Sequence, residues 1–223
     1  MLILGVDTSG KDGSIALVQF EQGNARTLEV VPLEGGTFSA QLVPQISDAL
    51  NRHRLSKLDI DGFAVVSGPG SFTGLRVGLA AIKALAEVLQ KPIAAVLLLE
   101  AVVRASGLQG DVVASLDASR GEVYTAEFQV SGSKAVINTQ QLLTIAEFIS
   151  ANRNAQVVTA DAKIADSLRE KGLRVAEIHR PRADTIARVG FEKIQAGEVI
   201  ASEALDANYI RRSDAEAKKS GGH

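Results

Sequence analysis

Short apolar runs alternate with amphipathic stretches along this chain, a pattern typical of α/β proteins. The elements predicted for the first half are, in order, strands at residues 2–6, 14–20 and 27–31, a helix at 40–53, a strand at 63–66, a helix at 75–89 and a strand at 93–96. A Lys-Asp-Gly turn joins the first two strands into a β-hairpin. Ser39 is the expected N-cap of the first helix, and the second helix is expected to end before Pro92.

The second half repeats this order more loosely. Its predicted elements are strands at 112–116 and 122–130, a helix at 144–151, a strand at 157–158, a helix at 162–171, a strand at 174–178 and a helix at 184–196. Placed beneath the first hairpin, Asp7 falls on Asp117 and Ser9 on Ser119. Hairpins that end in Asp and Gly are also common from turn chemistry alone, so these identities leave chance similarity open.

The order of elements is that of an actin-like nucleotide-binding fold, in which two related α/β lobes each carry a mixed five-stranded sheet with helices. We therefore expect an N-terminal lobe over residues 1–104 that carries the interaction helices, and a C-terminal lobe over 105–212. The charged and then Gly-rich residues 213–223 are expected to be a disordered tail.

The helix at 75–89 has two apolar stripes, although a helix that packs on a single sheet needs only one. One stripe consists of Leu75, Leu79, Ile82, Ala86 and Leu89, and the other of Val77, Ala81, Ala84 and Val88. The second stripe predicts a further partner, unless the helix is enclosed on all sides by its own fold. Gly78 costs this helix about 1 kcal/mol relative to Ala, which indicates close approach of a neighbouring backbone.

Two loops are candidates for phosphate binding. The glycine-rich turn before the long helix lacks the lysine of a nucleotide-hydrolysing P-loop, and we expect Ser71 and Thr73 to be turn and cap residues. Asp7, Thr8 and Ser9 end the first strand, where actin-like enzymes bind nucleotide phosphate, and Asp117 ends the corresponding strand. These four residues form a candidate vestigial nucleotide site; the alternative is an Asx turn, in which Asp7 only binds backbone amides.

Composition narrows the classes of function. The 223 residues contain 24 Lys and Arg against 26 Asp and Glu, and this net charge of −2 argues against strong autonomous nucleic-acid binding. There is no cysteine, which excludes disulfides, thiolate metal sites and a cysteine nucleophile. The three histidines form no metal-binding pair, and no Gly-x-Ser-x-Gly elbow is present. With no signal sequence or apolar run of membrane length, the prediction is a cytoplasmic protein without a metal site.

Four segments together resemble the TsaB family, the bacterial subunits of tRNA threonylcarbamoyladenosine biosynthesis once grouped with glycoprotease-like proteins. They are the Asp-Thr-Ser loop at 7–9, GPGSFTGLRVG at 68–78, LDASRGEVY at 116–124 and YIR at 209–211. The resemblance runs in order from residue 1 to 212, and the glycine segment is its most specific part. It supports the internal repeat and the actin-like fold, which is shared with acetate and sugar kinases. Many members carry a histidine where this chain has Gly36-Thr37-Phe38.

The resemblance implies a non-catalytic scaffold and activator that forms a heterodimer with the catalytic paralogue TsaD, which threonylcarbamoylates N6 of adenosine 37 in tRNA. It also implies binding of the ATPase subunit TsaE, a homodimer when the paralogue is missing, and tRNA contact mainly through the complex. No cofactor is expected for this chain, and binding of ATP or ADP with magnesium at the level of the complex is left open. The alternatives are an independent nucleotide-dependent phosphotransferase and, less favoured, a peptidase. The predicted interface residues are Leu42, Ile46, Leu50, Thr73, Arg76, Val77, Ala81, Ala84 and Val88.

Overall fold

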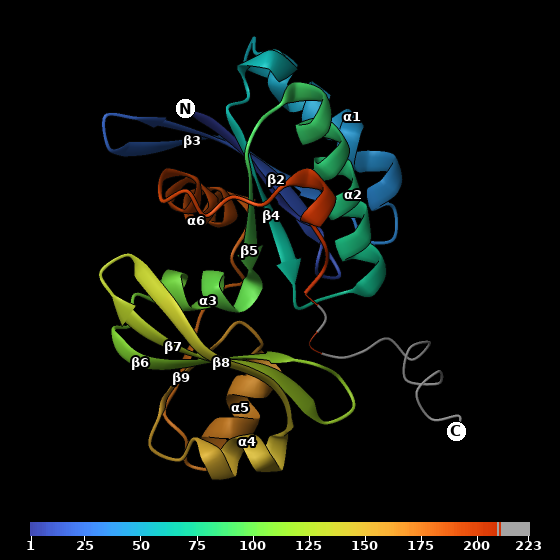
Figure 1. Cartoon of the computed structure of the whole chain (residues 1–223). Coiled ribbons are helices and arrows are strands. Elements are labelled where there is room, and N and C mark those ends of the chain that lie inside the picture. The colour runs from blue at the N-terminus through green and yellow to red at the C-terminus, as the bar shows by residue number, and fades with distance from the viewer. Residues whose placement is uncertain (209, 211–223) are drawn as a thin grey trace, which may run out of the picture. The chain divides into compact units, whose positions relative to one another are not determined.

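The computed structural model of the chain describes residues 1–208 and residue 210. The chain folds into two compact units (Figure 1). The first unit combines Met1–Ala101 with Pro181–Ala207, and the second contains Val102–Arg180 and the described residues after Ala207. The boundary between the units falls within helix α3 (Leu98–Ser106).

The first unit is built on a mixed five-stranded sheet with the order β3-β2-β1-β4-β5. Its strands are β1 (Leu2–Asp7), β2 (Gly13–Glu21), β3 (Asn24–Leu33), β4 (Gly62–Gly68) and β5 (Ile93–Leu97). Strand β1 pairs antiparallel to β2 and parallel to β4. Helices α1 (Phe38–Arg52) and α2 (Phe72–Leu89) pack on one face, and α6 (Ala183–Gln195) covers the other. Because β1 and β4 are covered on both faces, every residue in them is buried and both read as continuous apolar runs.

The second unit repeats this arrangement. Its strands β6 (Gly110–Asp117), β7 (Glu122–Ser131), β8 (Lys134–Thr144), β9 (Gln156–Thr159) and β10 (Val175–Glu177) have the order β10-β9-β6-β7-β8, which is the first order read from the other edge. Helices α4 (Ile145–Ala151) and α5 (Ala162–Glu170) pack on this sheet. Both units also carry an irregularity between their second and third strands, at Leu17/Val18 and at Glu127/Phe128. The predicted duplicated, actin-like α/β fold is confirmed.

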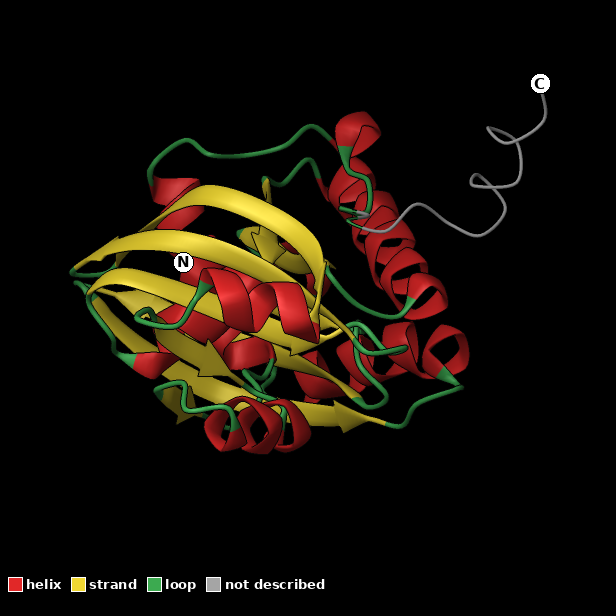
Figure 2. Ribbon diagram, turned by 90° about the horizontal axis from the view of Figure 1, so that it is seen from below, coloured by secondary structure: helices red, strands yellow, loops and turns green. Residues whose placement is uncertain are grey.

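The two sheets have separate cores. In the second unit one buried cluster joins Val113, Val123 and Val157 of the strands to Phe148 of α4 and Ile164 of α5. Figure 2 shows the strands and helices of the chain by colour, with helices lying against the strands. Two short 3₁₀ helices, η1 (Lys57–Asp59) and η2 (Ser202–Ala204), complete the elements of the described chain. Within the same residues no helix is both long and apolar enough to cross a lipid bilayer.

Three sequence-based expectations differ from the structure. The division into residues 1–104 and 105–212 is wrong at 181–207, because α6 packs on strands of the first sheet. Strand β8 was not predicted, since its apolar residues fall in two short runs, 135–137 and 142–143, separated by polar residues. Helix α1 begins at Phe38 with Thr37 as its N-cap, not after Ser39, because Phe38 is buried and takes part in the first turn. The tail at 213–223 lies outside the described residues.

Candidate functional site

The glycine-rich turn before α2 is held against the loop that joins β1 and β2. Ser71 caps α2, since its hydroxyl accepts a hydrogen bond from the Gly74 amide at 3.3 Å. Its own amide donates to the Ser9 carbonyl at 2.8 Å. The Thr8 hydroxyl donates to the Gly74 carbonyl at 2.7 Å. Residues 7–9 and the first turn of α2 therefore form one hydrogen-bonded unit, and the predicted cap role of Ser71 is confirmed.

Two glycines of α2 permit this close approach. A Cβ atom built on Gly74 would lie 2.0 Å from the Thr8 carbonyl oxygen, and one on Gly78 would lie 2.4 Å from the Thr8 hydroxyl oxygen. Both distances are far below van der Waals contact. Gly78 thus admits a neighbour, as its cost to the helix indicated, but that neighbour is the Thr8 side chain of the same chain rather than a backbone.

The aspartates that end β1 and β6 form the same local turn in different surroundings. Asp7 is buried, and its Oδ1 accepts hydrogen bonds from the Ser9 amide, at 2.8 Å, and the Ser9 hydroxyl. Asp117 is exposed, and its Oδ1 accepts from the Ser119 amide at 2.8 Å. Both are Asx turns, which is the alternative that the sequence offered. A nucleotide role for Asp7, Thr8, Ser9 and Asp117 stays a prediction.

The two apolar stripes of α2 have different surroundings. The larger side chains, Leu75, Leu79 and Ile82, are buried against the first sheet together with Ala86. On the second stripe Val77 and Ala81 are half-buried, Ala84 is exposed, and Val88 is 74% exposed. The stripe that faces away from the unit's own core is therefore the second one, a choice that the sequence left open.

The predicted contribution of α1 to an interface needs correction. Leu42, Ile46 and Leu50 are at most 5% exposed, because they form the side of α1 that packs on the first unit's core. Their side chains are not accessible to a partner. Val43, which is 54% exposed, lies on the solvent side of α1 instead. The signal for it was present in the sequence, since Val43 is an apolar residue out of phase with the main stripe.

The first turn of α2 also presents polar and aromatic groups. The Arg76 guanidinium lies 3.7 Å from the centre of the exposed Phe72 ring, a cation–π geometry. Thr73 is exposed one residue further on. We name this surface the α1/α2 face and define it by Val43, Phe72, Thr73, Arg76, Val77, Ala81, Ala84 and Val88.

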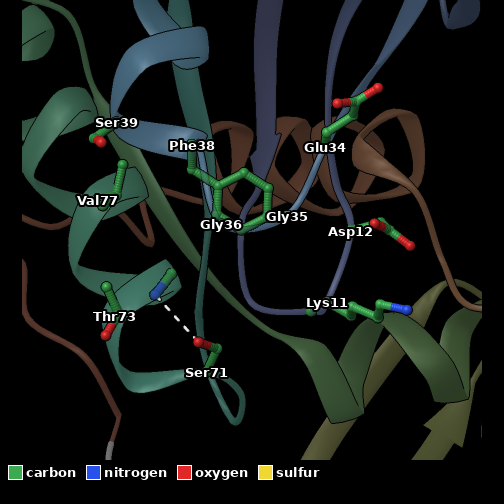
Figure 3. A pocket seen from close by; sticks show the side chains of 12 residues that line it. Lys11, Asp12, Glu34, Gly35, Gly36, Phe38, Ser39, Ser71, Thr73 and Val77 are labelled. Carbon is green, nitrogen blue, oxygen red and sulfur yellow. Dashed lines mark hydrogen bonds between the residues drawn. The ribbon is translucent and has the colours of Figure 1, made fainter.

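A cavity of about 510 Å³ borders the α1/α2 face (Figure 3). Its residues come from the β1–β2 loop, the β3–α1 loop and the first turns of α1 and α2. Phe38 and Val77 provide apolar surface, and Lys11, Asp12 and Glu34 provide charge of both signs. Within the described residues, no group of three or more His, Asp or Glu side chains is placed to hold a metal ion.

Comparisons with known proteins find relatives of similar sequence and a solved structure of the same fold. A family model described as TsaD, tRNA N6-adenosine threonylcarbamoyltransferase, matches residues 30–214. The TsaB protein of Bacillus subtilis is 32% identical, with 98% of this chain and 97% of that protein aligned. The TsaB protein of Escherichia coli is 28% identical over 99% of both. The solved structure of YeaZ from Pseudomonas aeruginosa shares the fold, with a TM-score of 0.77 at 21% identity over 93% of this chain and 99% of that one.

The aligned relatives span both units, so the similarity is not limited to one lobe. The glycine segment and the Asp-Thr-Ser loop, which carried the resemblance, are also the residues joined at the start of α2. The chain belongs to the TsaB family of tRNA threonylcarbamoyladenosine biosynthesis proteins, within the wider TsaD family.

Proposed function

We propose that the chain is a non-catalytic subunit for threonylcarbamoylation of N6 of adenosine 37 in tRNA. It acts by pairing through the α1/α2 face with a catalytic paralogue of the TsaD type. In the absence of that paralogue, two copies of the chain pair through the same face. TsaE and tRNA join at the level of the complex, together with any ATP or ADP and magnesium.

The second stripe of α2 is the observation that carries this proposal. Val77, Ala81, Ala84 and Val88 recur along one side of an 18-residue helix, and exposure increases toward its C-terminal end. Small side chains on this side allow a second helix to approach at about 8 Å between axes. An exposed apolar stripe, with a further exposed apolar residue, Val43, on the neighbouring helix α1, is typical of a protein interface.

The hydrogen bonding of the glycine turn supports a non-catalytic role. In a phosphate-binding loop the backbone amides point toward the ligand. Here the Ser71 amide donates to the Ser9 carbonyl, and the Ser9 amide donates to Asp7. Thr8 occupies the space beside Gly74 and Gly78. These amides are therefore engaged within the chain rather than directed at a phosphate.

Light-scattering mass on a sizing column, with the paralogue from the same source, tests the pairing. The unmodified chain is expected to be a dimer alone and to form a one-to-one complex with the paralogue. Ala84→Glu places a charge on the exposed stripe without disturbing the core, and it should abolish both assemblies because the charge has no partner in a desolvated contact. Ala146→Glu, at an exposed position of α4, is the matched control and should behave like the unmodified chain.

Complex formation by Ala84→Glu with unchanged affinity would show that the α1/α2 face is not the docking surface. Calorimetry with ATP and magnesium on the isolated chain examines the catalytic alternative. Tight binding with turnover there would contradict the non-catalytic role, whatever the oligomeric state.

A further inference from the structure

A second cavity lies on the second unit, where α4 crosses the ribbon formed by β7 and β8. Its volume is about 200 Å³. Its polar lining residues are Thr125, Glu127, Thr139, Gln141, Glu147 and Asn152. Thr125 pairs with Gln141 across the ribbon and Glu127 pairs with Thr139, so these four side chains leave the same face of the sheet. Glu147 and Asn152 come from α4 and its C-cap.

The hydroxyl of Thr125 lacks a hydrogen-bond partner within the described chain. Thr125 is 5% exposed and lines the cavity, and its Oγ1 is buried. Its cross-strand neighbour Ser115 is fully buried, and the Ser115 hydroxyl also lacks a partner among the same residues. Buried polar groups in native proteins are almost always paired, since an unpaired one is costly. Thr125 therefore indicates an occupant of the cavity that forms hydrogen bonds.

The charge of the lining indicates which kind of occupant fits. Glu127 and Glu147 are carboxylates, and no Lys, Arg or His lines the cavity. The Thr144 hydroxyl and backbone amide donate to Glu147 Oε2, at 2.7 and 2.9 Å, and these bonds hold the pKa of that carboxyl below its ordinary value. The carboxylate is thus charged at neutral pH. Hydroxyl, amide and carboxylate oxygens together favour a cation that donates hydrogen bonds.

The size of the cavity favours an organic cation over a bare ion. About 200 Å³ equals the volume of six or seven waters at about 30 Å³ each, far more than a metal ion occupies. Leu143 and Ala151 add apolar surface to the lining, which suits a short alkyl chain. Four of the oxygen-bearing side chains, Glu127, Thr139, Gln141 and Glu147, are exposed, so the cavity is reachable from solvent.

We propose that this cavity binds a small primary alkylammonium ion, with the ammonium group held by the Thr125 hydroxyl and the Glu127 and Glu147 carboxylates. The alkyl chain lies against Leu143 and Ala151. The α1/α2 face has no part in this proposal, so the proposal is tested independently of the proposed function.

Two-dimensional amide NMR of the full chain, titrated with n-butylammonium chloride at constant ionic strength, tests this site. Saturable shifts are expected at residues of β7, β8 and α4, with a Kd of roughly 1–10 mM for so small a ligand. The uncharged analogue n-butanol should bind at least about tenfold more weakly, because it cannot form charge-assisted hydrogen bonds with carboxylates.

Variants then identify the groups that bind. Thr125→Val keeps the shape of the side chain and should weaken butylammonium binding roughly three- to tenfold by removing one hydrogen bond. Glu127→Gln should weaken it by about tenfold, because a charge-assisted bond becomes a neutral one. Glu170→Gln, exposed at the end of α5, makes the same change in net charge away from the cavity and should leave binding unchanged.

The proposal would be overturned by the absence of a saturable shift, by equal binding of butanol and butylammonium, or by equal weakening in Glu127→Gln and Glu170→Gln. Tighter binding of potassium or magnesium chloride than of butylammonium at the same amides would also overturn it, since the occupant would then be a metal ion. Unchanged affinity in Thr125→Val would overturn it too, because the unpaired Thr125 hydroxyl is the observation on which the site rests.

Discussion

Replacing Gly78 by Ala tests the contact that joins the β1–β2 loop to α2. The new Cβ would lie 2.4 Å from Thr8 Oγ1, while the other Thr8 side-chain atoms are at an ordinary 3.6 Å. Threonine is stiff at χ1, and this hydroxyl is also held by its bond to the Gly74 carbonyl. Relief of the overlap therefore costs that bond, about 1 kcal/mol, and overpacking strain of about 1–3 kcal/mol. The gain in helix propensity is about 1 kcal/mol, so we expect a net destabilisation of about 1–3 kcal/mol.

Whether Gly78→Ala lowers or raises the free energy of unfolding should depend on the residue at position 8. In a Thr8→Ala background the overlapping oxygen is absent, and Gly78→Ala should stabilise the chain by up to about 1 kcal/mol. Thr8→Val is the control, since it removes the hydrogen bond but keeps an atom in the place of the oxygen, and Gly78→Ala should remain destabilising there. Urea unfolding followed by circular dichroism, with m checked for constancy, measures each difference. An interaction energy below about 0.5 kcal/mol between the substitutions at positions 8 and 78 would refute the contact between Thr8 and Gly78.

Two further predictions concern buried or paired polar groups. Ser115→Ala should leave the midpoint of thermal unfolding unchanged or raise it, because the Ser115 hydroxyl has no hydrogen-bond partner within the described residues. Ser14→Ala should instead lower the free energy of unfolding by about 1 kcal/mol, because the Ser14 hydroxyl accepts a hydrogen bond from the Ala183 amide at 3.0 Å. The opposite ranking would contradict this pairing. The hydrogen bond from Arg52 lowers the pKa of Glu29 from its ordinary 4.5, so Glu29 stabilises the fold above that pH and the stabilisation is lost as pH falls through the lowered value. Glu29→Gln should therefore unfold at a lower temperature than the unmodified chain at pH 7, and this difference in unfolding temperature should disappear in acid. If the difference were the same at every pH, loss of the Glu29 carboxylate charge would not be the cause of the destabilisation.

Most of the elements could be predicted from local pattern. Buried strands such as β1 and β4 are continuous apolar runs, and Ser71 followed by an apolar helix is a strong start signal. Strand β8 lacked such a signal, because it forms the edge of its sheet and its side chains are largely exposed. Its pairing with β7 closes a hairpin through the two-residue turn Gly132-Ser133, so the turn carried a local signal that the prediction from apolar runs did not use.

The division into units was mispredicted for a related reason. The periodicity of α6 shows which of its sides is apolar, but not which sheet that side covers. In the structure its buried residues pack on the first sheet, although the helix follows Val102–Arg180 of the second unit in sequence. The apolar stripe of α1 was likewise recognised but assigned to an interface, whereas Leu42 and Ile46 belong to the unit's own core. A strongly apolar side on an otherwise polar helix is first of all a core signal.

The comparison of the two repeats explains what the glycine segment does. Both repeats form the Asx turn after their first strand, with the same 2.8 Å bond from the serine amide to the aspartate. Only Asp7 is buried, because α2 lies over that turn and is brought close by Gly74 and Gly78. The glycine segment is therefore required first for packing of the loop on the helix. Since Thr8 and the sheet fix one side of α2, the orientation of the helix is set, and Ala84 and Val88 are placed on the opposite, exposed side, where the proposed partner binds.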